Sequence, residues 1–314
     1  MLEEFKKEVI EGLSKTEQKT LPSKYFYDKK GDALFVEIMR LPEYYLTRAE
    51  MEIFRKKTND IITALQLDRD KKYSIVELGA GDGTKTIHLL RALTNRNFDF
   101  DYLPVDISID ALDGIKTFLN AELPTLVVKP SHTDYFKALE SLKQDGTIKI
   151  ILFLGSNIGN LLDEQATEFI YQLGSSLAKG DKIILGVDLK KDKEIILPAY
   201  NDSQGITAEF NLNLLDRINK ELGADFNRDY FIHAPVYDEE MGIAKSYIKS
   251  LVKQSVRLGD HQFNFEKDEL IHTEVSRKYD DQVVKQILSK TDITWEHKII
   301  DSNNLFADYI LERN

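Results

Sequence analysis

From about residue 73, short apolar segments alternate with stretches whose apolar residues recur at helical spacing. The apolar segments are expected to be strands and run 73–78, 101–105, 125–128, 148–154 and 182–187. The intervening segments 85–93, 109–119, 135–142 and 164–178 are expected to be helices. Strands that are apolar almost throughout are typical of a parallel sheet buried on both faces. The pattern therefore predicts an α/β fold with a doubly wound, Rossmann-like sheet.

The alternation breaks at about residue 193 and returns near residue 281. The intervening segment is rich in Asn, Asp and Glu and mixes an expected helix, 210–222, with strand-like pieces, 244–256 and 262–265. After it come an expected helix and two strands close enough for an antiparallel hairpin. We therefore expect a seven-stranded sheet domain made of residues 59–194 and 279–314. Residues 1–58 and 195–278 are expected to form a second domain.

Charge and composition narrow the partners and the chemistry. The chain has 42 Lys and Arg against 53 Asp and Glu, a net charge of −11, which repels nucleic acids and anionic membrane surfaces. It has no cysteine, which excludes disulfides, thiolate catalysis and Cys-type zinc sites. No apolar run approaches the ~20 residues of a membrane span, and the first residues lack the apolar core of a signal peptide. We expect a cytoplasmic monomer that binds a small molecule, with no metal, nucleic acid or membrane partner.

A glycine-rich turn follows the first expected strand of the sheet. Glu77 precedes Gly79, Gly81 and Gly83, so the third glycine comes one residue earlier than in the G-x-G-x-x-G dinucleotide fingerprint. Glycine in such a turn lets backbone N–H groups approach a ligand. An acid followed by G-x-G-x-G resembles motif I of S-adenosylmethionine-dependent methyltransferases, in which an acid can sit near the cationic methionyl end of the cofactor.

Two aspartates follow the next expected strands. Asp106 ends the second strand, where its carboxylate can accept hydrogen bonds from both ribose hydroxyls of a nucleoside. Asp134 closes the third unit and could accept a hydrogen bond from the adenine amino group. Either aspartate could instead cap a helix.

Four blocks of sequence resemble the histidine-specific Nα-methyltransferases, the enzymes of ergothioneine biosynthesis that trimethylate L-histidine to hercynine. The blocks are 21–50, the glycine turn through Lys85, 153–161 with 186–192, and 271–279. They follow one another in the family order over nearly the whole chain. The resemblance implies a cofactor-binding methyltransferase domain and a substrate-binding domain made of the N-terminal segment and the insertion.

The resemblance also implies a role for individual residues. Cofactor contacts are expected at Gly79, Gly81, Lys85, Asp106, Asp134 and Gly155, the last at the junction with the substrate. Substrate contacts are expected at Tyr27 and Tyr44 beside the amine, at Asn160 and Tyr200 on the carboxylate, and at Glu274 and Ser276 on the imidazole. Glu274 can accept an imidazole N–H while Ser276 offers a hydroxyl, so an apolar side chain would leave buried polar groups unpaired.

One departure from the family pattern bears on the substrate. Ser246 stands where the histidine enzymes carry a methionine that packs near the substrate ring, so an apolar wall is exchanged for a hydroxyl. Another amino acid, such as a tryptophan-like compound, or a ring nitrogen of histidine therefore stays an alternative target. An NAD-dependent oxidoreductase and a non-catalytic binding protein are more distant alternatives.

The expected chemistry is an in-line transfer of a methyl group from a sulfonium to a neutral amine. Such a reaction depends mainly on positioning and desolvation and needs neither a metal nor a covalent intermediate. Tyr27 and Tyr44 are the candidates for orienting the amine and passing on its proton.

Overall fold

The computed structural model describes residues 2–106, 108–133, 135–142 and 146–314. The chain forms two compact units. The first unit comprises Met1–Tyr45 and Lys191–Arg277, and the second comprises Leu46–Lys190 and Lys278–Asn314.

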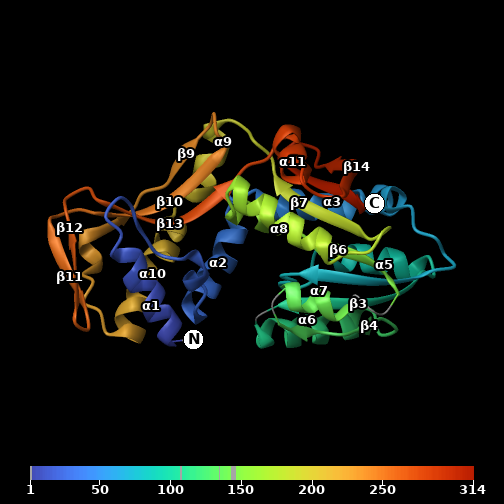
Figure 1. Cartoon of the computed structure of the whole chain (residues 1–314), viewed down its shortest axis with the longest axis horizontal. Helices are drawn as coiled ribbons and strands as arrows, with labels where there is room; N and C mark the ends of the chain where they lie inside the picture. Colours follow the sequence, from blue (N-terminus) through green and yellow to red (C-terminus); the bar gives the residue numbers. More distant parts are fainter. Residues whose placement is uncertain (1, 107, 134, 143–145) are drawn as a thin grey trace. The chain divides into compact units, whose positions relative to one another are not determined.

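The second unit is built on a sheet whose strand order is β14-β15-β7-β6-β2-β3-β4, with β5 also paired to β3. Its strands are β2 (Lys72–Leu78), β3 (Asp99–Asp106), β4 (Val127–Val128), β5 (Ser131–His132), β6 (Ile148–Phe153), β7 (Lys182–Asp188), β14 (Ile293–Ile300) and β15 (Phe306–Arg313). Neighbours from β7 to β5 are parallel, whereas β15 runs antiparallel to β7 and β14. This confirms the predicted α/β sheet and its terminal hairpin (Figure 1).

The third predicted strand, 125–128, is observed as the two-residue β4, and a further short strand, β5, follows it. β4 pairs with Asp101 and Tyr102 of β3, and β5 pairs with Val105 and Asp106 farther along the same strand. Pro130 lies in the gap between them and has no N–H to donate to the sheet. β4 and β5 therefore fill one position at this edge.

Helices cover both faces of this sheet. The elements of the second unit are α3 (Leu46–Lys56), α4 (Thr58–Leu65), α5 (Ile87–Asn95), α6 (Ile109–Glu122), α7 (Tyr135–Leu142), α8 (Asp163–Ser175), α11 (Asp281–Leu288) and the 3₁₀ turn η2 (Asn157–Asn160). Residues of α3 to α6 pack on one face with Ile75 and Leu152, and residues of α7, α8 and α11 pack on the other with Val76 and Ile151. Adjacent strand residues thus face opposite cores, as the predicted apolar strands require.

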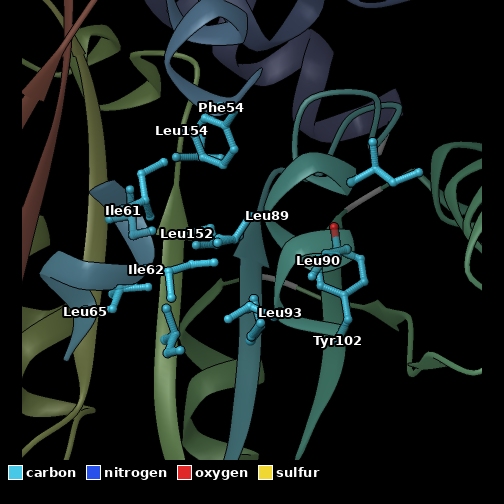
Figure 2. Close-up of a cluster of buried hydrophobic side chains, with 14 of the residues drawn as sticks. Phe54, Ile61, Ile62, Leu65, Leu89, Leu90, Leu93, Tyr102, Leu152 and Leu154 are labelled. Atoms are coloured by element: carbon cyan, nitrogen blue, oxygen red, sulfur yellow. The ribbon is translucent and has the colours of Figure 1, made fainter. Parts of the chain in front are cut away.

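Figure 2 shows part of the first of these two cores, where leucines of α5 meet isoleucines of α4 and Leu152 and Leu154 at the end of β6. Full burial of each such side chain contributes about 1.5–3 kcal/mol to folding. Phe54 of α3 belongs to the same cluster. The sequence interpretation grouped residues 46–58 with the N-terminal domain; α3 belongs instead to the second unit, because its apolar face is buried in this core.

The first unit combines a sheet that is antiparallel except for the parallel pair β1 and β13 with helices from both ends of its sequence. Its elements are α1 (Leu2–Leu13), β1 (Lys19–Thr20), η1 (Ser23–Phe26), α2 (Lys29–Arg40), α9 (Lys193–Tyr200), α10 (Ile206–Leu222), η3 (Arg228–Tyr230), β8 (Phe231–His233), β9 (Val236–Asp238), β10 (Ile243–Ser250), β11 (Gln254–Leu258), β12 (His261–Phe265) and β13 (Leu270–Arg277). The sheet order is β1-β13-β10-β8, with β9 on β10, while β11 and β12 form a separate hairpin. The core unites α1, α2 and α10 with β8, β10 and β13.

Candidate active site

Three of the predicted cofactor residues lie at one edge of the sheet of the second unit. Gly79 follows β2, Asp106 ends β3 and Gly155 follows β6. These strands are parallel neighbours in the order β6-β2-β3, so their carboxyl ends share an edge. The strands that follow β2 in sequence begin on one side of it with β3, whereas β6 and β7 lie on its other side. The strand order therefore reverses at β2, and open α/β sheets bind ligands at such a position.

The glycine turn has the backbone conformation that its sequence predicts. Gly79 and Gly81 have φ of +74° and +58°, in the left-handed region that favours glycine. The turn is anchored where the N–H of Gly79 donates to the carbonyl of Val105 at 2.9 Å. Gly83 serves packing, because a Cβ on it would lie 2.7 Å from Ile115 Cγ1.

The acid of this motif is buried rather than exposed toward a ligand. Glu77 is 3% exposed. Its Oε1 accepts a hydrogen bond from Thr86 Oγ1 at 2.7 Å, and its Oε2 accepts one from the hydroxyl of Tyr102. Desolvation raises the pKa of Glu77 to about 7, although both hydroxyls oppose this effect. Glu77 therefore joins β2, β3 and the start of α5 from within the fold.

Lys85 is held by an acid from outside the motif. Its ammonium pairs with Glu50 of α3, which is 1% exposed. The two oxygens of Glu50 also accept from the N–H of Gly155 at 2.9 and 3.0 Å. Glu50 thus connects two predicted cofactor residues, Lys85 and Gly155.

A second buried acid lies beside this group. Asp308 of β15 is fully buried, and neither of its carboxyl oxygens has a hydrogen-bond partner among the described residues. A Cβ on Gly186 would lie 2.3 Å from Glu50 Oε1 and 3.1 Å from Asp308 Oδ1, so both acids border this glycine. Desolvation and then the charge of Glu50 raise the pKa of Asp308 well above its usual range. Burial therefore favours the protonated form of Asp308.

The remaining predicted residues of the second unit differ in how they are held. Asp106 Oδ1 accepts a hydrogen bond from the N–H of Ser108 at 2.9 Å, so this aspartate does shape the turn before α6. Asn160 ends η2 and is exposed. Asp134 lies outside the described residues.

In the first unit, the predicted imidazole residues share one face of the β10 and β13 pair. Ser246 is opposite Glu274, and Ala244 is opposite Ser276. The Ser246 hydroxyl donates to Glu274 Oε2 at 3.3 Å. The Tyr200 hydroxyl donates to Ser276 Oγ at 2.8 Å.

An irregularity in the strand pairing positions Glu274. The register shifts between Ser246 and Tyr247, where Thr273 is the extra residue on β13. The Thr273 hydroxyl contacts the Ser246 carbonyl at 3.0 Å and Asn211 of α10 at 3.1 Å. Bulges of this kind re-aim a neighbouring side chain. The bulge therefore turns Glu274 to the face that carries Ser246.

The two predicted amine-side tyrosines belong to one aromatic cluster. The rings of Tyr27 and Tyr44 both meet Phe35, with centroids 5.6 and 6.2 Å away, and Tyr27 also meets Phe210 at 5.7 Å. Tyr27 immediately precedes Asp28, the residue that caps α2 by accepting from the N–H of Gly31. Desolvation, followed by the charges of Glu274 and Asp32, raises the pKa of the Tyr27 phenol. Tyr27 is thus a neutral hydroxyl near Glu274.

Comparison with known proteins decides the family. A family described as histidine-specific, S-adenosylmethionine-dependent methyltransferases matches residues 5–313. This chain belongs to that family. The histidine N-alpha-methyltransferase of Mycobacterium tuberculosis is 37% identical over 282 residues, which span 89% of this chain and 86% of that protein. The protein of the same description from Mycolicibacterium smegmatis is 34% identical over 297 residues, 94% of this chain and 90% of its own length.

A fungal relative is longer. Ergothioneine biosynthesis protein 1 of Schizosaccharomyces pombe is 30% identical over 300 residues, which span 93% of this chain and 39% of that protein. Family membership confirms an S-adenosylmethionine-dependent methyltransferase, and the early third glycine is consistent with it.

Two residues of this methyltransferase escaped the sequence interpretation. Glu50 lies on the same helix face as the buried Ala49, Ile53 and Phe54, and an acid on an apolar face was the available signal. Asp308 similarly interrupts the apolar residues 306–311 of β15.

The described part of this methyltransferase also bears on metal binding and on membrane insertion. Within that part, no three His, Asp or Glu side chains are grouped so that they could hold a metal ion. Its helices include none with the length and apolar character needed to traverse a bilayer.

Proposed function

We propose that this methyltransferase transfers methyl groups to the α-amino group of L-histidine, stepwise to the trimethylated product hercynine. The observation that carries the substrate is the pair Glu274 and Ser276 on one face of β13. A neutral imidazole has one N–H and one bare nitrogen, which a carboxylate and a hydroxyl can satisfy together. The family and the names of its relatives support the same substrate.

The carboxyl edge of the sheet fits S-adenosylmethionine. The glycine turn keeps side chains away from the strand ends, and Asp106 supplies a carboxylate for ribose hydroxyls. Gly79, Gly81, Lys85, Asp106, Asp134 and Gly155 are proposed to hold the cofactor, which when bound supplies the electrophilic methyl group. Glu50 keeps Lys85 and the Gly155 N–H in fixed positions.

The residues of the first unit are proposed to hold and orient the amino acid. Tyr200 and Asn160 are the residues that the family resemblance proposes as donors to the carboxylate. Tyr27 and Tyr44 orient the amine, and because the pKa of Tyr27 is raised, its phenol acts as a neutral partner rather than as a strong base. The ammonium proton can leave through a relay in which the Tyr27 oxygen accepts it as the phenol proton passes to solvent water. Repeated methylation requires these contacts to hold the amine in each of its methylated forms.

Ser246 supports a second candidate substrate. Its hydroxyl is buried beside Glu274, where the family resemblance predicts a methionine. A tryptophan-like amino acid could donate its indole N–H to Glu274, although the ring has no second nitrogen for Ser276. Histidine therefore matches more of the polar groups in this part of the first unit.

The direct test is to incubate the purified protein with S-adenosylmethionine and an equimolar mixture of the twenty amino acids. Mass spectrometry should show one, two and three methyl groups on histidine and on no other amino acid. The same assay can be run on the variant Glu274→Gln, which changes the proposed imidazole contact. Its matched control is Glu266→Gln, because Glu266 is an exposed acid of the same unit and pairs with Lys253. Selective methylation of another amino acid would replace histidine by the second candidate, with Ser246 as the specificity switch.

The cellular setting belongs to this proposal as well. We expect the enzyme to act in the cytoplasm as a monomer without a nucleic-acid partner. The net charge of −11 supports the last expectation. Light scattering coupled to size-exclusion chromatography would contradict a monomer by showing twice the chain mass.

A further inference from the structure

A phenol and an amide meet the glycine turn at a point where nothing assigns them a role. A Cβ on Gly79 would lie 2.9 Å from the hydroxyl of Tyr135 and 3.3 Å from Nδ2 of Asn157. Tyr135 begins α7, and Asn157 begins η2 after β6. Two polar groups from separate elements therefore converge on the first glycine of the turn.

The Tyr135 ring is packed against the protein, whereas its hydroxyl makes no hydrogen bond to the described residues. The ring packs edge-on against Phe153 of β6, with centroids 6.1 Å apart and an interplanar angle of 72°. Across the described residues, neither the Tyr135 hydroxyl nor the Asn157 side-chain amide has a hydrogen-bond partner in the protein. Both side chains are half-buried. Polar groups in such a position bond to water or to a ligand, so these two donors are available to a ligand.

The neighbouring charge defines what these donors can recognise. Desolvation and the negative charge of Asp106 raise the pKa of Tyr135 to about 12, so its hydroxyl keeps the proton it can donate. In the strand register, Asp106 of β3 lies opposite His132 at the end of β5, three residues before Tyr135. The carboxylate can only accept hydrogen bonds, whereas the phenol and the amide nitrogen can donate them. A sugar hydroxyl does both, and a vicinal diol matches this set of donors and acceptor.

We infer that Tyr135 and Asn157 are cofactor-binding residues that donate hydrogen bonds to the ribose hydroxyl oxygens whose protons Asp106 accepts. The inference deepens the proposed function, since it rests on S-adenosylmethionine binding at this edge. It explains why the turn requires glycine at position 79: a side chain there would displace both donors.

The test is binding of S-adenosylhomocysteine and of its 2′-deoxy and 3′-deoxy analogues, measured by calorimetry on the full chain. Tyr135→Phe removes one hydrogen bond to the cofactor. The variant should therefore bind S-adenosylhomocysteine about fivefold to tenfold more weakly than the wild type does. For the deoxy analogue that lacks the contacted hydroxyl, Tyr135→Phe and the wild type should have the same affinity. Asn157→Asp, which exchanges a donor for an acceptor, should weaken the natural compound at least as much. Tyr171→Phe, an exposed tyrosine of α8, is the matched control and should bind normally.

The outcomes separate this inference from the function on which it rests. If the wild-type protein fails to bind S-adenosylhomocysteine, the proposed cofactor is wrong. If it binds but Tyr135→Phe has the same affinity, Tyr135 is not a contact. If Tyr135→Phe lowers the affinity for S-adenosylhomocysteine and for both deoxy analogues by the same factor, the Tyr135 hydroxyl contacts another part of the cofactor. That result overturns the ribose assignment. Thermal unfolding of each variant confirms that the fold is retained.

Discussion

The buried acid of the glycine motif yields a sharp prediction about stability and pH. In Glu77→Gln, an uncharged amide replaces a carboxyl whose pKa is raised from 4.5 to about 7. The gap corresponds to about 3 kcal/mol at about 1.4 kcal/mol per pH unit. Thr86 and Tyr102 carry hydroxyls that can donate or accept, so the amide can satisfy both.

The direction of the effect follows from which state releases the proton first. Below about pH 4.5, Glu77 is protonated in both the folded and the unfolded chain. Between about pH 4.5 and 7 the unfolded chain releases this proton and the folded chain keeps it, so Glu77 lowers the free energy of unfolding as pH rises. Above pH 7 the full cost is present. Glu77→Gln should therefore gain stability over the wild type on going from pH 4.5 to pH 8, by up to about 3 kcal/mol.

The chain offers a suitable probe and a matched control. Trp295, the single tryptophan, lies on β14 of the second unit and reports the unfolding of the unit that contains Glu77. Urea unfolding monitored by its fluorescence at both pH values gives the required difference. Glu122→Gln removes an exposed acid paired with Arg91 and should change stability by less than about 0.5 kcal/mol at either pH. A Glu77→Gln effect that is independent of pH would refute the raised pKa.

Three further substitutions test the site. Glu50→Gln removes the partner of Lys85 and should lower the stability of the second unit by about 3 kcal/mol in the same fluorescence assay, an effect that retained stability would contradict. Glu274→Gln should raise the KM for histidine at least about tenfold while S-adenosylhomocysteine affinity stays unchanged, and a matching change in Glu266→Gln would assign the effect to surface charge. Tyr27→Phe should lower kcat at unchanged cofactor affinity, and equal turnover would remove Tyr27 from the reaction.

The architecture of the second unit was predictable because its signals are local. A few neighbouring residues suffice to specify an apolar strand, a helical spacing or a glycine with positive φ. The glycine turn therefore lies directly after β2, as the sequence predicts. The short strand β5 lies outside the predicted segment 125–128, because Pro130 separates it from β4.

The missed features depend on residues distant in sequence. The helix α3 has a strong apolar face, but only the tertiary fold shows that this face packs in the second unit. Glu50 and Asp308 resemble ordinary acids until β15 and α3 are placed beside Gly186. The bulge at Thr273 depends on the pairing of β13 with β10, which lies about 25 residues away along the chain.

The central claim is methyl transfer to the α-nitrogen of L-histidine. The most direct measurement is a time course with S-adenosylmethionine and L-histidine labelled with ¹⁵N only at the α-amino group, followed by NMR detection of new methyl carbons. The account predicts that monomethyl, dimethyl and trimethyl products appear in that order, with every new methyl carbon coupled to the labelled nitrogen. Methyl groups on a ring nitrogen, or no transfer to histidine by protein that binds S-adenosylhomocysteine, would contradict it.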